Sequence, residues 1–223
     1  MKDKVFIWLG VLMLGWGAGL AQAAVSPEEV IAKVQAQYDK SGGLKTRFRQ
    51  ESRLKAVSHA DVAEGWMYFQ KPSRMRWQYE SPPDQKKELI SDGKQVWMYI
   101  PQDSLVMVYP VKQVMRSDLV MRFFSGMGEF QKDFQISWRR PPETGNPHVV
   151  DCIPRQRQPE LKVLTLTINP RTFIVEKLEF TNAVGEETRF TFTQSQLDVR
   201  LAPDFFTFTP PPGVQVIKER QGS

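Results

Sequence analysis

The hydrophobic pattern of the chain begins with one amphipathic helix and then changes to the period of β-strands. Ser26, Pro27 and Glu29 form a helix start, with Ser26 as N-cap and Glu29 completing a capping box. Apolar residues then recur at helical spacing at positions 30, 31, 34 and 38, and Ser-Gly-Gly at 41–43 ends the helix. From residue 44 to 51, every second residue is charged, which predicts a strand with one face in water.

Short strands separated by turn residues fill most of the remaining chain. Residues 62–109 form a series of apolar and aromatic runs, separated at prolines and at Asp92-Gly93, a strong hairpin signal. Similar runs follow at residues 134–138, 149–153, 161–168, 173–180, 188–193 and 205–209. We therefore predict about ten antiparallel strands, and a sheet of that size must curl or close.

One further helix is predicted at residues 117–128, where the β pattern stops. Ser117 is its expected cap, and its apolar side carries Leu119, Val120, Phe123, Phe124 and Met127. A helix this apolar must cover another apolar surface. The predicted fold is therefore mainly β (α+β): a curved antiparallel sheet forming an incomplete β-barrel, with a helical lid over an apolar cavity.

The first 23 residues are typical of a cleavable signal peptide. Lys2 and Lys4 precede an apolar run, and Ala21-Gln22-Ala23 is a cleavage site of the A-x-A type. The run is too short and rich in glycine for a good membrane span. We expect a soluble protein exported to the periplasm, with residues 24–223 as a single domain.

Charge and residue types argue against several functional classes. The formal net charge of +5 is spread along the chain, so we expect no nucleic-acid partner. His59 and His148 are the two histidines and lie far apart in the sequence, so we expect them to be structural or solvated and predict no metal site. The chain has no P-loop, G-x-G-x-x-G or G-x-S-x-G motif, and we predict no cofactor, no catalytic residues and no enzyme activity.

Cys152 is the single cysteine and has no intramolecular disulfide partner. We expect a buried structural thiol. The alternative, a reactive nucleophile, would need one of the two histidines nearby as a base.

The candidate binding chemistry is an apolar surface on the strands between residues 64 and 110. Alternation places one set of side chains on a single face, allowing for a kink at Pro72: Met67, Phe69, Lys71, Met75, Trp77 and Tyr79. This set can be an ordinary barrel core or an adaptable cavity, because methionine repacks around variable ligands. Lys71 is its one charged member, and it either reaches solvent at the strand end or pairs with the lid, with Asp118 as a candidate.

Several of these segments together resemble a known family. They are Phe48-Arg49-Gln50, the stretch from Glu64-Gly65-Trp66 to Lys71-Pro72, Met75-Arg76-Trp77-Gln78-Tyr79, Ser91-Asp92-Gly93 with Trp97-Met98-Tyr99, and Phe206-Thr207-Phe208 with Pro210-Pro211-Pro212-Gly213. Their order and spacing are similar to those of the periplasmic outer-membrane lipoprotein carrier family, LolA, over the whole mature chain.

The resemblance implies a function and a set of site residues. A carrier of this kind takes acylated lipoproteins from an inner-membrane ABC transporter and hands them to an outer-membrane receptor; we expect it to act as a monomer. Lys71 stands where the family has an arginine that holds the lid closed, and lysine offers a point charge rather than a planar fork. The residues expected to line the acyl-chain cavity are Met67, Phe69, Met75, Trp77, Tyr79, Trp97, Tyr99, Phe123, Phe124, Met127, Phe206 and Phe208.

Two other functions stay open at this point. A protein with the same cavity can carry a different lipid, such as a glycolipid or a polyisoprenoid, and the mass of a co-purified ligand would separate this case from a lipoprotein carrier. A lipoprotein-sensing domain can share the sheet, although such proteins usually carry a second domain.

Overall fold

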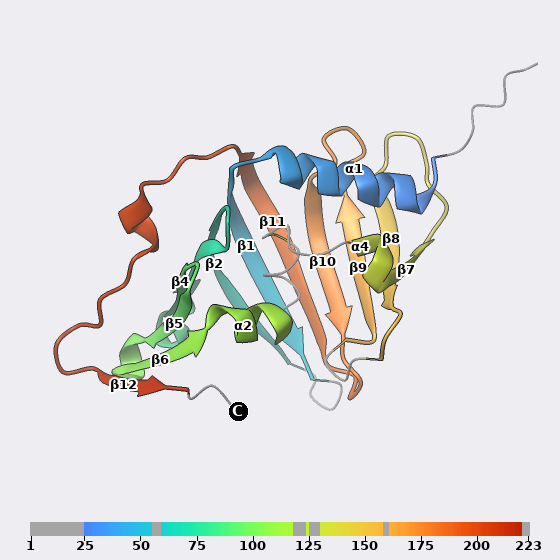
Figure 1. Cartoon of the computed structure of the whole chain (residues 1–223). Helices are drawn as coiled ribbons and strands as arrows, with labels where there is room; N and C mark the ends of the chain where they lie inside the picture. The colour runs from blue at the N-terminus through green and yellow to red at the C-terminus, as the bar shows by residue number, and fades with distance from the viewer. Residues whose placement is uncertain (1–24, 55–58, 118–123, 125–129, 158–160, 220–223) are drawn as a thin grey trace, which may run out of the picture.

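A curved sheet of twelve strands forms the framework of the described part of the molecule, and it does not close into a barrel (Figure 1). The computed structural model of the 223-residue chain describes residues 25–54, 59–117, 124, 130–157 and 161–219. The strands follow the spatial order β12-β6-β5-β4-β3-β2-β1-β11-β10-β9-β8-β7. Their bounds are β1 Gly43–Arg53, β2 Ala60–Gln70, β3 Arg74–Ser81, β4 Lys87–Asp92, β5 Gln95–Ile100, β6 Leu105–Pro110, β7 Phe134–Trp138, β8 His148–Pro154, β9 Val163–Ile168, β10 Val175–Thr181, β11 Glu187–Leu197 and β12 Gln215–Lys218.

The helices define an inner and an outer face of this sheet. Helices α1 (Pro27–Lys40), α2 (Val111–Ser117) and α4 (Phe130–Asp133) lie on the face that we call inner, while the C-terminal segment runs along the other side of β3–β6 (Figure 1). Short 3₁₀ helices also lie between strands, namely η1 (Pro83–Gln85), η2 (Pro101–Asp103) and η3 (Pro203–Phe206). None of the helices in the described residues has the length and hydrophobicity needed to cross a membrane.

The predicted first helix is confirmed, with the expected capping box. The Ser26 hydroxyl accepts a hydrogen bond from the Glu29 amide, and the Glu29 carboxylate accepts one from the Ser26 amide, both at 3.1 Å. These two bonds satisfy amides that have no partner within the helix. The apolar face of α1 is fully packed, with exposures of 0–6% at Val30, Ile31, Val34 and Tyr38.

Side-chain alternation along the strands places the core on the inner face. Phe48, Met67 and Trp77 belong to one buried cluster that also includes the apolar face of α1. Toward the β7 end of the sheet, Leu164 and Leu166 on β9 and their neighbours on β8 and β10 join the same cluster on the inner face. The predicted parity of β2 and β3 is therefore confirmed.

Most of the helix predicted at residues 117–128 lies outside the described residues, and Phe124, the one described residue in its interior, is helical. Helix α2 begins at Val111, and Ser117 is its last residue rather than a cap at its start. It follows β6 directly and contacts β5 and β6. The other residues of the predicted helix, among them Phe123 and Met127, lie outside the described residues, with Phe124 as the exception.

The strand predicted at residues 205–209 is wrong. Its first two residues close η3, and the last strand is β12, which pairs in parallel with β6. Prolines at 203 and 210–212 lack the amide hydrogens that a strand needs for pairing. The alternation of phenylalanines at 206 and 208 reflects packing over the outer face, where the ring of Phe208 lies 5.4 Å from that of Tyr99.

Gly65 offers a test of the packing between β2 and β3. It sits at a register shift between these strands, and a Cβ there would overlap the Gln78 carbonyl oxygen and reach 3.1 Å from the Phe48 ring. We expect Gly65→Ala to lower the free energy of unfolding by about 2–3 kcal/mol, because neither backbone nor ring can yield cheaply. Urea denaturation measures this loss. Gly42→Ala is the matched control, since a Cβ at Gly42 meets nothing within 4 Å, and equal stabilities of the two variants would contradict the packing.

Cys152 provides a second test, of core access. The side chain is fully buried on β8, as predicted, and burial raises the pKa of its thiol to about 12. We expect no reaction of the folded protein with a disulfide reagent at pH 8, because the reactive thiolate is scarce and inaccessible. One equivalent of thiol should react per chain in guanidinium. Fast labelling of the folded protein would instead indicate the reactive nucleophile that the sequence left open.

Candidate functional site

An aromatic cluster lies at the centre of the inner face. The rings of Trp77 and Tyr79 on β3 stack with centroids 5.9 Å apart. Phe48 on β1 meets both edge-on, at 5.5 Å and 5.0 Å, and Phe190 on β11 lies 5.5 Å from Trp77. Neighbouring strands therefore hold these four rings in defined orientations.

Phe124 closes one end of this cluster. Its ring lies 5.5 Å from Phe69 on β2, 5.5 Å from Tyr38 on α1 and 5.2 Å from Phe192 on β11, and the residue is 5% exposed. A residue between α2 and α4 thus fills the space between the first helix and two strands. Moving this single ring would expose apolar surface on all three elements.

Burial decreases along one row of inner-face residues that crosses the sheet. Strand register places Trp77 opposite Leu89, Leu89 opposite Met98 and Met98 opposite Met107, so these side chains share one face from β3 to β6. Trp77 is 3% exposed, whereas the other three are partly exposed. The row is a continuous apolar surface, buried at the centre of the sheet and accessible toward β6.

Polar groups lie beside the aromatic cluster, on the side of Tyr79. The Tyr79 hydroxyl donates a hydrogen bond of 2.9 Å to the Gln50 side chain. The Lys87 Nζ lies 4.4 Å from the centroid of the Tyr79 ring, a cation–π contact. Burial lowers the pKa of the Lys87 ammonium. The inner face therefore changes from apolar to polar within two residues of Trp77 along β3.

Lys71 ties the turn between β2 and β3 to the end of α1. Its Nζ donates a hydrogen bond of 2.7 Å to the backbone carbonyl of Asp39 and lies 3.8 Å from the Asp39 carboxylate. Its amide also donates to the Gly42 carbonyl, at 3.2 Å. A cation at the C-terminus of a helix is favourable because the last carbonyls lack partners within the helix. Asp118, the partner considered from the sequence, lies outside the described residues.

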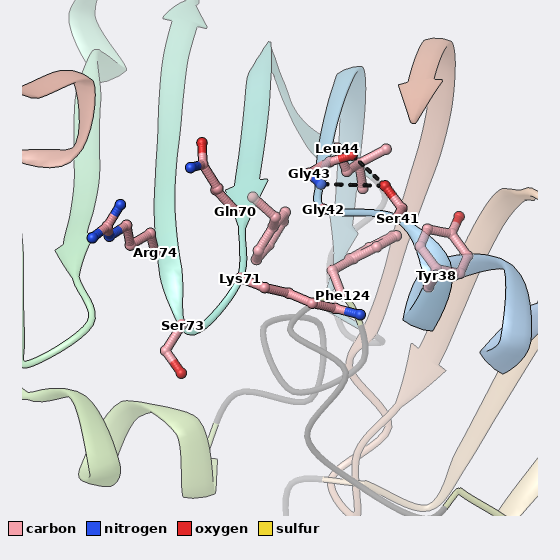
Figure 2. A pocket seen from close by; sticks show the side chains of 11 residues that line it. Tyr38, Ser41, Gly42, Gly43, Leu44, Gln70, Lys71, Ser73, Arg74 and Phe124 are labelled. Carbon is pink, nitrogen blue, oxygen red and sulfur yellow. Dashed lines mark hydrogen bonds between the residues drawn. The ribbon is translucent and has the colours of Figure 1, made fainter. Parts of the chain in front are cut away.

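A narrow pocket lies beside this contact, between Tyr38, Phe69, Lys71 and Phe124 (Figure 2). Its accessible volume of about 10 Å³ is enough for one water molecule. The pocket is therefore far too small for an acyl chain in this conformation.

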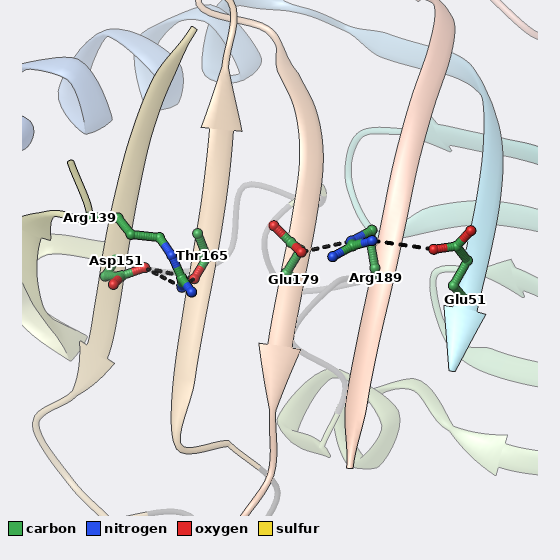
Figure 3. Close-up of polar contacts among 6 residues, drawn as sticks. All are labelled: Glu51, Arg139, Asp151, Thr165, Glu179 and Arg189. Carbon is green, nitrogen blue, oxygen red and sulfur yellow. Dashed lines mark hydrogen bonds and ion pairs between the residues drawn. The ribbon is translucent and has the colours of Figure 1, made fainter. Parts of the chain in front are cut away.

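Polar side chains on the outer face, from Glu51 on β1 to Asp151 on β8, pair with one another (Figure 3). Arg189 donates to Glu179 at 2.7 Å and lies 3.4 Å from Glu51, and Arg139 donates to Thr165 at 2.9 Å. The hydrogen bond that Arg189 donates to Glu179, together with the negative charge of Glu179, raises the pKa of the Arg189 guanidinium. A pocket of about 200 Å³ on this side is lined by such charged residues of both signs. Paired charges at this level of exposure are typical of a solvated surface.

The structure brings together half of the residues predicted to line the cavity. Met67, Phe69, Met75, Trp77, Tyr79 and Phe124 all belong to the inner cluster or pack against it. Phe123 and Met127 lie outside the described residues.

Four of the predicted cavity residues lie elsewhere, on the outer face. Val96 belongs to the inner cluster, so its neighbour Trp97 points to the other side of β5, and Tyr99 follows the same parity. The ring of Phe208 lies 6.4 Å from Trp97 and 5.4 Å from Tyr99, and Phe206 precedes it in the C-terminal segment. We therefore leave Trp97, Tyr99, Phe206 and Phe208 out of the candidate site.

Sequence reasoning missed the partly exposed residues Leu89, Met98 and Met107. The signal for them was available, because the Asp92-Gly93 hairpin fixes the pairing of β4 with β5 and so places Met98 opposite Leu89. The prediction instead chose Trp97 and Tyr99, the aromatic residues on either side of Met98, and these lie on the outer face.

The described residues offer no metal centre, since no group of three or more His, Cys, Asp or Glu side chains lies close enough to hold one. His148 packs between the rings of Trp138 and Phe173, at 5.6 Å and 6.5 Å. Burial and the nearby charge of Lys33 lower the pKa of its imidazole. This environment is that of a structural histidine.

Comparison with known proteins identifies relatives over nearly the whole chain. Residues 39–209 match the model of the family described as "Outer membrane lipoprotein carrier protein LolA". The chain is 28% identical over 213 residues to an outer-membrane lipoprotein carrier protein of Methylibium petroleiphilum, covering 96% of this chain and 98% of the relative. It is 27% identical over 211 residues to the protein of the same name from Pseudomonas aeruginosa, covering 95% and 97%.

A solved structure has a similar fold. An uncharacterized conserved protein from Thermus thermophilus superposes with a TM-score of 0.56 at 12% identity, covering 86% of this chain and 98% of the other. The unclosed curved sheet and the family match over residues 39–209 agree, and the chain belongs to the LolA family of outer membrane lipoprotein carrier proteins.

Proposed function

We propose that this protein is a periplasmic chaperone that carries acylated lipoproteins from an inner-membrane ABC transporter to an outer-membrane receptor. Membership of the LolA family supports a lipoprotein carrier role. The structural observation that carries the proposal is the apolar row from Trp77 to Met107, which is partly exposed on the inner face of the sheet. Acyl chains bound along this row would be shielded from water. The predicted signal peptide at residues 1–23 lies outside the described residues and supplies the route of export in this proposal.

The energetics of acyl chains explain why such a carrier needs a closed state. Each methylene removed from water contributes about 0.8 kcal/mol, so one long chain is worth roughly 10 kcal/mol. Three chains held perfectly would exceed the limit of roughly 20 kcal/mol reached by the tightest noncovalent complexes, and release would be too slow. Rearranging a closed protein on binding subtracts from this affinity.

The arrangement around Phe124 and Lys71 fits that requirement. Phe124 fills the space that a chain would need between α1 and β2, so binding has to displace its contacts with Tyr38 and Phe69. Lys71 fastens α1 to the β2–β3 turn beside the same pocket. In the proposal, Lys71 is a latch that favours the closed state and thereby promotes release of the cargo.

The first prediction concerns cargo release. The mature chain, residues 24–223, added to spheroplasts or to proteoliposomes with an active lipoprotein transporter, should yield a soluble one-to-one complex with an acylated lipoprotein. Met98→Asp should reduce complex formation at least tenfold, because it places a charge on the partly exposed apolar row. Thr193→Asp on the exposed outer side of β11 is the control and should behave as wild type.

Two results would redirect the proposal. No complex with a demonstrably active transporter would refute lipoprotein carriage, and the mass of any extractable ligand would then identify a carrier of another lipid. Equal complex formation by Met98→Asp and wild type would place the acyl chains elsewhere on the molecule.

The second prediction concerns the latch. Lys71→Leu removes the bond to the Asp39 carbonyl, and the resulting loss of closed state should slow transfer of bound lipoprotein to a receptor about three- to tenfold. This magnitude corresponds to roughly 1 kcal/mol for a charged hydrogen bond at a residue whose side chain is 36% exposed. The half-time of transfer in a two-component assay measures the effect.

Matched variants separate the latch from a change in charge. Lys86→Leu removes an exposed lysine elsewhere and should transfer at the wild-type rate. Asp39→Asn should also be nearly silent, because the short contact of Lys71 is to the backbone carbonyl rather than to the carboxylate. Unchanged transfer by Lys71→Leu would refute the latch.

A further inference from the structure

The indole N–H of Trp77 is a buried hydrogen-bond donor to which the described part of the chain offers no acceptor. The residue is 3% exposed, and its Nε1 has no hydrogen-bond partner among the residues that the structure describes. More than nine in ten buried polar groups in proteins are hydrogen-bonded, and an unpaired donor lowers the stability of the fold. A phenylalanine would fill most of the same space without this cost. The donor therefore calls for an explanation in terms of function.

The side chains around Trp77 hold the indole in place but offer it little as acceptors. Its ring neighbours are Phe48, Tyr79 and Phe190, at centroid distances of 5.5–5.9 Å. Two of these rings have no oxygen, and the Tyr79 hydroxyl, which donates to Gln50, accepts no hydrogen bond from the indole. Stacking on one side and edge contact on another fix the orientation of the indole. The N–H is thus a preorganised donor.

Its position along β3 is the junction between apolar and polar surface. The inner face of this strand reads Met75, Trp77, Tyr79, with exposures of 1% and 3% followed by a partly exposed tyrosine. Beyond Trp77 lie the Tyr79 hydroxyl, Gln50 and the Lys87 ammonium. Across the sheet from Trp77, the apolar row continues through Leu89 and Met98.

An acyl ester has the same order of chemical groups. Its hydrocarbon chain is apolar, its headgroup is polar, and the carbonyl that joins them is an acceptor without a donor of its own. A chain laid on the apolar row, with its headgroup toward Tyr79 and Lys87, would place this carbonyl near Trp77. The unpaired indole donor and an ester carbonyl acceptor of the ligand would then meet.

We propose that the Trp77 indole N–H donates a hydrogen bond to the ester carbonyl of a bound acyl chain, which makes Trp77 a specificity-determining residue for ester-linked lipids. This inference rests on the proposed acyl-chain binding. It adds that lipids of equal hydrophobicity without a carbonyl near the headgroup, such as dialkyl ethers or polyisoprenoids, bind less well.

The test compares two ligands and three proteins. The ligands are a synthetic cysteine lipopeptide with two ester-linked palmitoyl chains and its dialkyl ether analogue with chains of the same length. The proteins are wild type, Trp77→Phe, and Trp97→Phe as a matched control on the outer face. Affinity is measured by displacement of a fluorescent fatty-acyl probe below the micelle concentrations of the ligands.

Wild type and Trp97→Phe should bind the ester about three- to tenfold more tightly than the ether, the range of one net hydrogen bond. Trp77→Phe should bind the two ligands equally. An ester preference that survives in Trp77→Phe, or equal binding of both ligands by wild type, would overturn the inference while leaving acyl binding intact. Failure of wild type to bind either ligand would instead refute the proposed function on which it rests.

A measurement on the wild-type protein keeps the inference testable if Trp77→Phe folds poorly. The indole ¹H–¹⁵N resonance of Trp77 should move downfield on addition of the ester ligand, because its proton enters a hydrogen bond, and should not do so with the ether. Identical shifts with both ligands would contradict a bond to the carbonyl.

Discussion

The structure depends on one imbalance: the inner face of the sheet carries more apolar surface than its helices cover. Helix α1 buries four apolar side chains against β7–β11 and the centre of the sheet, and Phe130 of α4 stacks on Phe134 at 4.6 Å. Toward β4–β6 the described helices leave Leu89, Met98 and Met107 partly exposed. Because apolar area left in water is unfavourable, such a surface is retained only where something else covers it at times. The incomplete cover is therefore the property on which binding depends.

The outer face of the same strands is covered in a different way. Ile90, Val106 and Phe206 are buried there at 0–1% exposure, beneath the C-terminal segment. This segment also adds β12 in parallel to β6. Strands β4–β6 are thus apolar on both faces, one side closed permanently by the chain itself and the other left accessible. The residues buried on the outer side give strands β4–β6 a small core of their own. These strands can therefore be stable while the apolar residues on their inner side stay uncovered.

Sequence reasoning succeeded where interactions are local and failed where they are distant. The capping box at Ser26, the hairpin at Asp92-Gly93 and the alternation of β1 were predictable, because each is specified within a few residues. The cover of Trp97 by Phe208 joins residues more than a hundred positions apart. Alternation assigns residues to two faces but does not say which face is the core when both are apolar. The error in the predicted cavity follows from this ambiguity, and so does the missed row through Met98.

The relation between affinity and selectivity explains why one hydrogen bond is useful in such a site. Hydrophobic burial of an acyl chain contributes roughly 10 kcal/mol but hardly distinguishes one long-chain lipid from another. A single bond from a fixed donor contributes only about 0.5–1.5 kcal/mol, which is too little to prevent release. It nevertheless depends on one carbonyl at one position, and a ligand without it leaves the Trp77 donor unpaired. A carrier that must release its cargo gains selectivity most readily from a weak directional contact placed beside a large nonspecific one, and the junction at Trp77 is where this fold allows it.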